Sequence, residues 1–380
     1  MDRETLEAAM YGTLFSPIEV GGVLLKNRIT MAPLYLGYAG EGGTITPLLL
    51  AHYQMMAQGG AAMIMVENAT VDHPSGSGSN RTIRADSDKN LAGLSDLAGA
   101  IKNQGAVAGL QINHAGRFAG VKNPVAPSGV DAFGRTPRPL EPGEIDHIRS
   151  QFASAAGRAK SAGFDMVELH GGTGYLLAQF VSPRTNKRED AYGGPLENRM
   201  KFPLDVVAAV KAEVGDFPVG YRFLADEFLD DGFKLEESTR FAAALADAGV
   251  AYLSVMGGTY ESFMLPDVIQ RSKKEGYMAD LAAAVKKHVA VPVIAAGRIS
   301  SGKVAQGIIG AGNADLVGLA RVLWADPEWP EKIRQGREND ITLCDPACDD
   351  ICMQLVMKGK PAFCPQWRPK KTRKLKDLFT

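Results

Sequence analysis

The chain has 380 residues, of which 45% are hydrophobic and 22% charged, and its formal net charge is −1. This balance is typical of a globular protein with a sizeable core, and it disfavours nucleic acid as the main partner, because phosphate binding needs a strongly basic field. The sequence contains no long uncharged apolar run and no basic-then-apolar N-terminus, so we expect no membrane span, no export and a cytoplasmic location.

The first element predicted along the chain is a β-hairpin over residues 15–27. Its turn falls at Gly21-Gly22, between two short apolar stretches, and paired glycines are favoured in tight hairpin turns. We expect this hairpin to lie as a plug across one end of the domain that follows.

From residue 28 onward, short apolar stretches alternate with longer amphipathic ones. The predicted strands are 28–33, 61–66, 106–112, 165–169, 217–223, 250–255, 291–296 and 314–319. The predicted helices are 46–58, 88–103, 144–162, 196–214, 235–247, 278–288, 301–310 and 327–337. Several strands show little polar–apolar alternation, which is typical of parallel strands buried on both faces. Eight βα units predict a closed (β/α)8 TIM barrel. The alternative is an open doubly wound sheet, which would usually carry a glycine-rich dinucleotide fingerprint after an early strand.

Two further segments depart from this alternation. Residues 115–143 are rich in Gly and Pro and form a long predicted loop after the third strand, at the end of the barrel where active sites are built. The alternation stops near residue 340. We therefore predict a barrel domain over 1–340 and a C-terminal segment over 341–380.

All four cysteines lie in this C-terminal segment. They are Cys344, Cys348, Cys352 and Cys364. Thiols concentrated in this way are more typical of metal binding than of disulfides, and four thiolates suit either zinc or an iron–sulfur cluster. Structural zinc sites usually pair two Cys-x-x-Cys knuckles, so three close cysteines and a distant fourth favour an iron–sulfur cluster. Zinc, free thiols on one helical face and a disulfide are the alternatives.

Five motifs spread over most of the chain together resemble the old yellow enzyme family. They are LFSPIEVGGVLLKNRITMAP (14–33), QINHAGR (111–117), HGGTGYLLAQFVSPRTNKREDAYGGPLENR (170–199), AAGRIS (295–300) and VGLARVLWADPEW (317–329). The chain is most similar to the iron–sulfur branch, which includes 2,4-dienoyl-CoA reductase, 2-enoate reductase and trimethylamine dehydrogenase. The resemblance runs from residue 14 to about 367. It implies a barrel that holds FMN and a [4Fe-4S] cluster bound by the four cysteines.

The resemblance also assigns residues to the flavin. The predicted cofactor-binding residues are Pro33, Leu34, Asn68, Gln111, Arg222, Gly297, Arg298, Ala320 and Arg321. Gln111 and Arg222 match the positions at the pyrimidine edge, where an amide and a cation stabilise the reduced flavin. Pro33 and Leu34 match the isoalloxazine edge, and Asn68 or Glu67 its polar rim. Gly297, Arg298 and Arg321 match the phosphate end. A Gln111 satisfied by buried neighbours and an Arg321 in a structural salt bridge are the alternatives.

The predicted catalytic residues are Tyr175, His170, Tyr260 and Tyr35. His170 ends the fourth strand, where a histidine can hydrogen-bond a substrate carbonyl. Tyr175 matches the tyrosine that donates a proton in the family when hydride from the flavin adds to a carbon–carbon double bond. A core histidine satisfied by the backbone is the alternative for His170, and simple loop packing is the alternative for Tyr175.

The chain departs from the family pattern at several of these positions. Thr173 replaces the second His or Asn that usually partners His170. Tyr35 stands where some relatives have a redox-tuning cysteine, and Tyr260 where dienoyl-CoA reductases have a catalytic histidine. The first cysteine spacing is one residue longer than the usual Cys-x2-Cys. The substrate is therefore not transferred from the family.

The resemblance predicts an ene-reductase that reduces a carbon–carbon double bond conjugated to a carbonyl or thioester. One alternative is a dehydrogenase or demethylase of an amine-type substrate that passes electrons out through the cluster. The other is a non-catalytic electron-transfer subunit.

The close relatives continue with FAD- and nicotinamide-binding domains, whereas this sequence stops at Thr380. We therefore expect a separate redox protein or subunit to exchange electrons with FMN through the cluster. The basic run from Arg368 to Lys376 could attract an acidic partner or be a solvated tail. Family members commonly self-associate, but no residue here fixes an interface.

Overall fold

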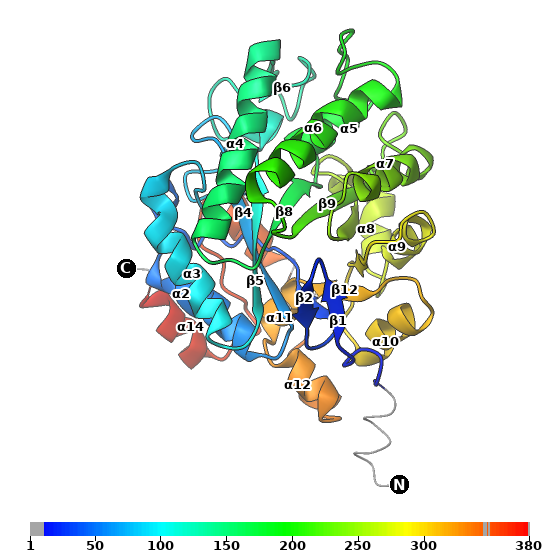
Figure 1. Ribbon diagram of the computed structural model, residues 1–380. Helices are drawn as coiled ribbons and strands as arrows, with labels where there is room; N and C mark the ends of the chain where they lie inside the picture. The colour runs from blue at the N-terminus through cyan, green and yellow to red at the C-terminus, as the bar shows by residue number, and fades with distance from the viewer. Residues whose placement is uncertain (1–10, 345–347, 349, 379–380) are drawn as a thin grey trace.

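Eight parallel strands form a closed barrel in this computed structural model, which describes residues 11–344, 348 and 350–378. Neighbouring strands follow the order β10-β11-β12-β3-β4-β5-β8-β9, and helices surround them (Figure 1). The strands are β3 (Ile29–Met31), β4 (Met63–Thr70), β5 (Val107–Asn113), β8 (Met166–Gly171), β9 (Val219–Asp226), β10 (Leu253–Gly257), β11 (Val293–Ala295) and β12 (Leu316–Leu319). The predicted (β/α)8 barrel is therefore confirmed, and each predicted strand is present.

The outer helices also follow the predicted order. They are α2 (Pro47–Gln58), α3 (Leu91–Lys102), α4 (Pro142–Ser161), α6 (Leu196–Val214), α7 (Leu235–Asp247), α9 (Ala279–Lys286), α10 (Gly302–Gly310) and α12 (Trp329–Arg334). Side-chain caps define several starts: the Thr46 hydroxyl accepts the Leu49 N–H at 3.1 Å, which satisfies a donor that the first turn leaves free. Helix α12 is shorter than the predicted helix 327–337. It ends before Gly336, whose φ of +66° stops the helical path.

Three short helices lie inside the βα loops: α5 (Leu176–Val181), α8 (Pro266–Ser272) and α11 (Arg321–Ala325). They have 6, 7 and 5 residues, too few to show a helical period in the sequence. The predicted loop 115–143 is also partly ordered by the short strands β6 (Val125–Ala126) and β7 (Arg138–Pro139).

The N-terminal hairpin closes one end of the barrel. It consists of β1 (Ile18–Val20) and β2 (Val23–Leu25), drawn in dark blue in Figure 1. Its apolar side packs on side chains that enter the barrel from several strands, including Met63, Met166 and Leu316. Gly21 has a φ of +58°, and a Cβ there would come within 2.8 Å of the Ala251 Cβ. Only glycine fits this close approach, and the predicted plug is confirmed.

The C-terminal segment packs on the outside of the barrel through α13 (Ile351–Met357) and α14 (Pro369–Lys376). Figure 1 shows α14 beside α2. The Tyr38 hydroxyl donates to the Ala362 carbonyl at 2.5 Å, and the Trp367 indole N–H donates to the Trp324 carbonyl at 3.0 Å. Across the described ranges, no helix is both long and apolar enough to span a membrane.

Candidate functional site

The predicted site residues gather at the carboxyl ends of the barrel strands, opposite the hairpin. Asn68, Gln111, His170 and Arg222 lie within β4, β5, β8 and β9. The remaining residues follow the ends of other strands: Pro33, Leu34 and Tyr35 after β3, Tyr260 after β10, Gly297 and Arg298 after β11, and Ala320 and Arg321 after β12. This is the end at which barrel enzymes build their active sites.

A buried carboxyl group links two of the predicted flavin-binding residues. Glu168 on β8 accepts a hydrogen bond from the Gln111 side-chain amide at 2.8 Å and one from the Tyr252 hydroxyl at 3.1 Å. Burial raises the pKa of Glu168, while the Arg222 guanidinium acts in the opposite direction. Glu168 therefore fixes the orientation of the Gln111 amide by binding its NH2 group. The amide oxygen of Gln111 is then left to accept a hydrogen bond from a ligand. Sequence reasoning missed Glu168, although a lone carboxylate inside an apolar strand was a signal.

Arg222 is a half-buried cation in the field of Glu168. Its Nη1 donates to the Ser254 hydroxyl at 2.7 Å. Burial lowers the pKa of Arg222, and Glu168 partly offsets this effect. A buried guanidinium is stable only with hydrogen-bonding or anionic partners. The arrangement therefore suits a ligand with an electron-rich polar edge.

His170, Tyr175 and Tyr260 form the polar part of the mouth. The His170 and Tyr175 ring centroids lie 4.7 Å apart, and the Tyr175 and Tyr260 hydroxyl oxygens lie 2.7 Å apart. The His170 Nδ1 accepts the Gly172 N–H at 3.2 Å. Burial lowers the pKa of His170 well below its usual range, and the charge on Arg222 adds to this effect. The ring is therefore neutral with its proton on Nε2, which makes it a donor.

Tyr175 and Tyr260 are both protonated over the whole working pH range. Burial raises the pKa of Tyr175 well above its usual value, and the neighbouring Tyr260 adds to this effect. Burial likewise raises the pKa of Tyr260. Tyr35 lies in the same electrostatic neighbourhood, but its hydroxyl pairs with the Ser79 hydroxyl at 2.5 Å.

Thr173, the position where relatives have a histidine or asparagine, does not pair with His170. Its backbone has a φ of +59°, which is uncommon for a β-branched residue. Its hydroxyl points to the Met256 sulfur at 3.5 Å. The Thr173 hydroxyl is therefore engaged with Met256 and not with His170.

The polar rim contains two buried acceptors that no described residue satisfies, the Glu67 Oε1 and the Asn68 Oδ1. Burial raises the pKa of Glu67 to about 8, so this carboxyl is mostly protonated at neutral pH. Its Oε2 lies 3.4 Å from the Tyr53 hydroxyl. Unsatisfied buried polar atoms are costly, and a bound molecule with its own polar atoms would satisfy them.

The opposite side of the site has the features of an anion cradle. Gly297 has a φ of +107°, and a Cβ there would meet the Met278 backbone nitrogen at 3.0 Å. Arg298 follows with a φ of +49°. The missing side chain of Gly297 lets a ligand approach the backbone closely at this turn. The Tyr277 phenol lies in the field of Arg298, Arg321 and Arg222, so positive charge converges here. Tyr277 was not predicted from the sequence.

These observations fit FMN. The glycine and arginines at 297, 298 and 321 suit a phosphate, the fixed Gln111 amide and the Arg222 cation suit a flavin's polar edge, and the unsatisfied oxygens of Glu67 and Asn68 remain for its other polar atoms.

An ion-pair network ties the loops around the mouth together. Arg117, which is buried, pairs with Glu261, and Arg184 contacts Glu261 at 3.3 Å and Asp231 at 2.7 Å. Because Glu261 directly follows Tyr260, the network holds the Tyr260 hydroxyl against Tyr175. Arg117 and Glu261 are 144 residues apart, so the sequence offered no sign of this contact.

The four cysteines lie at the edge of the barrel. Cys352 and Cys364 are buried, and Cys344 and Cys348 are half-buried. Burial raises the pKa of the Cys352 thiol to about 11. Among the described residues, no three candidate ligands surround a single point closely enough to hold one metal ion. The four thiols are nevertheless close enough to affect one another electrostatically, which fits a four-iron cluster that takes its cysteines at different irons. Arg321, predicted at the phosphate end, pairs with Asp350 between these cysteines.

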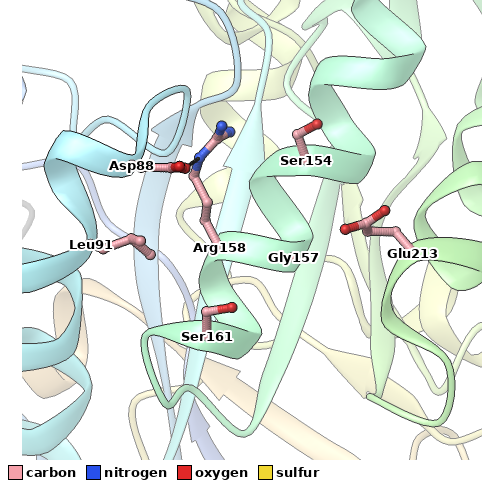
Figure 2. Close-up of a pocket in the computed structure, with 7 residues that line it drawn as sticks. All are labelled: Asp88, Leu91, Ser154, Gly157, Arg158, Ser161 and Glu213. Carbon is pink, nitrogen blue, oxygen red and sulfur yellow. Dashed lines mark hydrogen bonds and ion pairs between the residues drawn. The ribbon is translucent and has the colours of Figure 1, made fainter.

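A surface groove elsewhere on the molecule is unrelated to this site. It has a volume of about 310 Å³ and lies among α3, α4 and α6 (Figure 2). The Arg158 guanidinium crosses it to pair with Asp88 at 2.6 Å. None of the predicted site residues lines this groove.

Comparisons with known proteins identify the family of this chain. Residues 13–340 match the NADH:flavin oxidoreductase / NADH oxidase family. An NADH oxidase of Thermoanaerobacter brockii is 43% identical over 343 residues, which are 88% of this chain and 52% of that relative. The chain thus spans about half the length of this relative.

Two solved structures are similar over nearly the whole chain. A 2-naphthoyl-CoA reductase in complex with 2-naphthoyl-CoA has a TM-score of 0.90 at 28% identity, over 96% of this chain and 58% of the other. A histamine dehydrogenase from Rhizobium sp. 4-9 has a TM-score of 0.85 at 31% identity, over 96% of this chain and 53% of the other. The family match and these similarities confirm the predicted resemblance, and the chain belongs to the NADH:flavin oxidoreductase / NADH oxidase family.

Proposed function

We propose that this chain is an FMN-dependent ene-reductase that reduces a carbon–carbon double bond conjugated to a carbonyl or thioester. The observation that carries the proposal is the Tyr175–Tyr260 hydroxyl pair beside a neutral His170. Hydrogen-bond donors are thereby gathered at one point of the mouth, as the reduction of a carbonyl-activated double bond requires.

FMN, when bound, supplies the hydride for the β-carbon of the substrate. Residues of this chain are proposed to hold the FMN. Gln111 and Arg222 are proposed to bind the pyrimidine edge, Gly297 and Arg298 the phosphate, and Pro33 with its neighbours the ring edge. The positive charge of Arg222 would favour an anionic reduced flavin over a neutral one.

The substrate is proposed to place its carbonyl oxygen against the His170 Nε2–H. Tyr175 then donates its hydroxyl proton to the α-carbon, and the Tyr260 hydroxyl, 2.7 Å away, stabilises the oxygen that loses the proton. The ion pairs of Glu261 hold this geometry. The similarity to a structure bound to 2-naphthoyl-CoA supports a conjugated acyl thioester as the substrate class.

We propose further that Cys344, Cys348, Cys352 and Cys364 bind a [4Fe-4S] cluster, which supplies one-electron transfer at the edge of the barrel. A separate redox protein is proposed to dock nearby. The basic face of α14 supports an acidic partner, although two of its lysines also pack on aromatic rings: the Lys371 Nζ lies 4.2 Å from the Trp367 ring and the Lys376 Nζ 5.5 Å from Phe363.

A dehydrogenase of an amine-type substrate is the second candidate. The observation that favours it is the aromatic lining: the Phe118 ring lies 5.1 Å from Tyr260 and 6.4 Å from Tyr175, and the histamine dehydrogenase is similar. A cationic amine, however, needs an unpaired carboxylate or open aromatic faces. Glu261 is already paired with two arginines, and Arg222 adds positive charge. The site therefore supports the ene-reductase better.

An anaerobic stopped-flow experiment separates these functions. Dithionite-reduced protein is mixed with an enone, an enoyl thioester or a methylamine, and flavin reoxidation is followed by absorbance; oxidised protein is mixed with the same amine. We expect reoxidation by enones or enoyl thioesters. Reduction of the oxidised flavin by the amine would support the dehydrogenase, and no reaction with any of them would support a non-catalytic electron-transfer subunit. Iron and flavin analysis of the same sample tests both cofactors.

A further inference from the structure

The cysteine segment is anchored on loops that also carry predicted flavin-binding residues. The first is the loop after β3, which begins with Pro33 and Leu34. Further along this loop, the Leu36 carbonyl accepts the Ala362 N–H at 3.0 Å, and the Tyr38 hydroxyl donates to the Ala362 carbonyl at 2.5 Å. Ala362 lies two residues before Cys364, so this loop fixes the remote cysteine.

The second anchor is α11, which begins at Arg321 directly after β12. The Trp324 carbonyl accepts the Trp367 indole N–H at 3.0 Å, and the Arg321 guanidinium pairs with the Asp350 carboxylate. Asp350 lies between Cys348 and Cys352. Both groups of cysteines are therefore attached to the loops at the flavin end of the barrel.

The Arg321–Asp350 pair is the charged part of this contact. The Arg321 side chain is 33% exposed and that of Asp350 55%, so water screens the pair only in part. The thiols of Cys344 and Cys352 are near enough to affect the guanidinium electrostatically, and Cys344 also lies in the field of Arg298. Arg321 thus stands between the anion cradle and the cysteines.

The backbone of Asp350 turns the chain just before α13. Its φ of +50° and ψ of +38° are left-handed, a conformation that Asp and Asn adopt more readily than most other non-glycine residues. The ion pair with Arg321 fixes the Asp350 side chain at this turn. In return, Asp350 occupies the guanidinium Nη1 and leaves its other N–H donors for an anion.

We propose that Arg321 and Asp350 couple the flavin and cluster sites, so that filling one site tightens binding at the other. The inference rests on the proposed function, because it requires both cofactors. A cluster would fix Cys348 and Cys352 and with them Asp350, which holds Arg321 toward the phosphate of the flavin. Without the cluster, FMN binding also has to fix the Arg321 side chain, and this loss of side-chain entropy weakens FMN binding. By linkage, the flavin strengthens retention of the cluster by the same coupling free energy.

The test measures flavin affinity with and without iron under anaerobic conditions. Flavin-free protein is prepared with its iron retained or removed by a chelator, and FMN dissociation constants are measured by quenching of flavin fluorescence. We expect iron to tighten FMN binding about tenfold in the wild-type chain, within the usual range of coupling between sites. A second readout is the rate at which a chelator removes iron, which should be slower when FMN is bound.

Three variants assign the coupling to this pair. Asp350→Asn removes the charge but keeps a residue that tolerates a left-handed backbone. FMN should still bind, and the ratio of its dissociation constants without and with iron should fall from about ten toward one. Arg321→Gln should weaken FMN binding in both states and remove the iron effect, and Arg321→Lys should restore part of both. Arg334→Gln is the matched control, because Arg334 belongs to a surface pair within α12; it should behave as wild type.

The outcomes that overturn the inference differ from those that overturn the function. If the wild-type chain binds iron and FMN but its FMN affinity does not depend on iron, the coupling is absent and the proposed function stands. An undiminished iron effect in Asp350→Asn would overturn the role of this pair. A chain that binds no iron would overturn the cluster and the coupling together.

Discussion

Removing one hydroxyl from each member of the tyrosine pair tests which one donates the proton. Tyr175→Phe deletes the proposed general acid, and such groups contribute about 10²- to 10⁴-fold to rate. Tyr260→Phe deletes only its partner, 2.7 Å away. This leaves the Tyr175 hydroxyl under-satisfied in a buried site, at a cost of about 1–3 kcal/mol, or about 5- to 150-fold in rate if that cost falls on the transition state.

The assay is the single-turnover reoxidation of dithionite-reduced protein by an enone, followed by stopped-flow. We expect Tyr175→Phe to be slower than Tyr260→Phe, and the double variant to be no slower than Tyr175→Phe alone, because two residues that act as a unit are not additive. Reduction of the flavin by dithionite should be unchanged in all three. A larger loss in Tyr260→Phe would assign the proton to Tyr260, and wild-type rates in both variants would refute the reasoning.

Three further changes test other parts of the molecule. Burial raises the pKa of Glu67 to about 8, so the folded state keeps this proton while the unfolded state loses it from about pH 4.5 upward. The free energy of unfolding of the wild type therefore falls as the pH rises. Glu67→Gln should gain up to about 4 kcal/mol of unfolding free energy relative to wild type between about pH 5 and about pH 8, and a pH-independent difference in denaturant unfolding would contradict the buried carboxyl. Gly297→Ala should weaken FMN binding about tenfold or more, because a Cβ there meets the Met278 nitrogen and the φ of +107° strains any side chain. Gly307→Ala is the control, because no heavy atom lies within 4 Å of its Cβ. Equal FMN affinities of the two variants in fluorescence titrations would argue against the cradle. Cys364→Ser should abolish most of the bound iron, and full iron content in this variant would exclude it as a ligand.

The barrel was predictable because its signals are local. Each strand is a short apolar run bounded by turn residues, and each long helix presents an apolar face, so the order of elements could be read without any contact information. The motifs at 111–117 and 170–199 added the family. The short helices α5 and α11 escaped because five or six residues cannot show a period, yet they place Tyr175 and Arg321.

Contacts between distant residues were not predictable. Glu168 holds Gln111 from the next strand of the barrel, and Glu261 reaches Arg117 across 144 residues. No spacing rule connects such partners, because they meet only when the barrel closes. The roles assigned to His170, Tyr175 and the flavin-binding residues stay predictions, while their common position at one end of the barrel follows from where each strand ends.

The hairpin of β1 and β2 has a consequence for the order of events in catalysis. The barrel interior is filled by side chains that the hairpin covers at one end, so under the proposed function a reductant and a substrate would both reach the flavin from the opposite end. If both occupy the same place over the flavin, they bind in turn, and an excess of either should inhibit the other. Electrons delivered through the proposed cluster would need no room at that end. A substrate bound at the mouth can then wait for its electrons, and turnover need not alternate between two occupants.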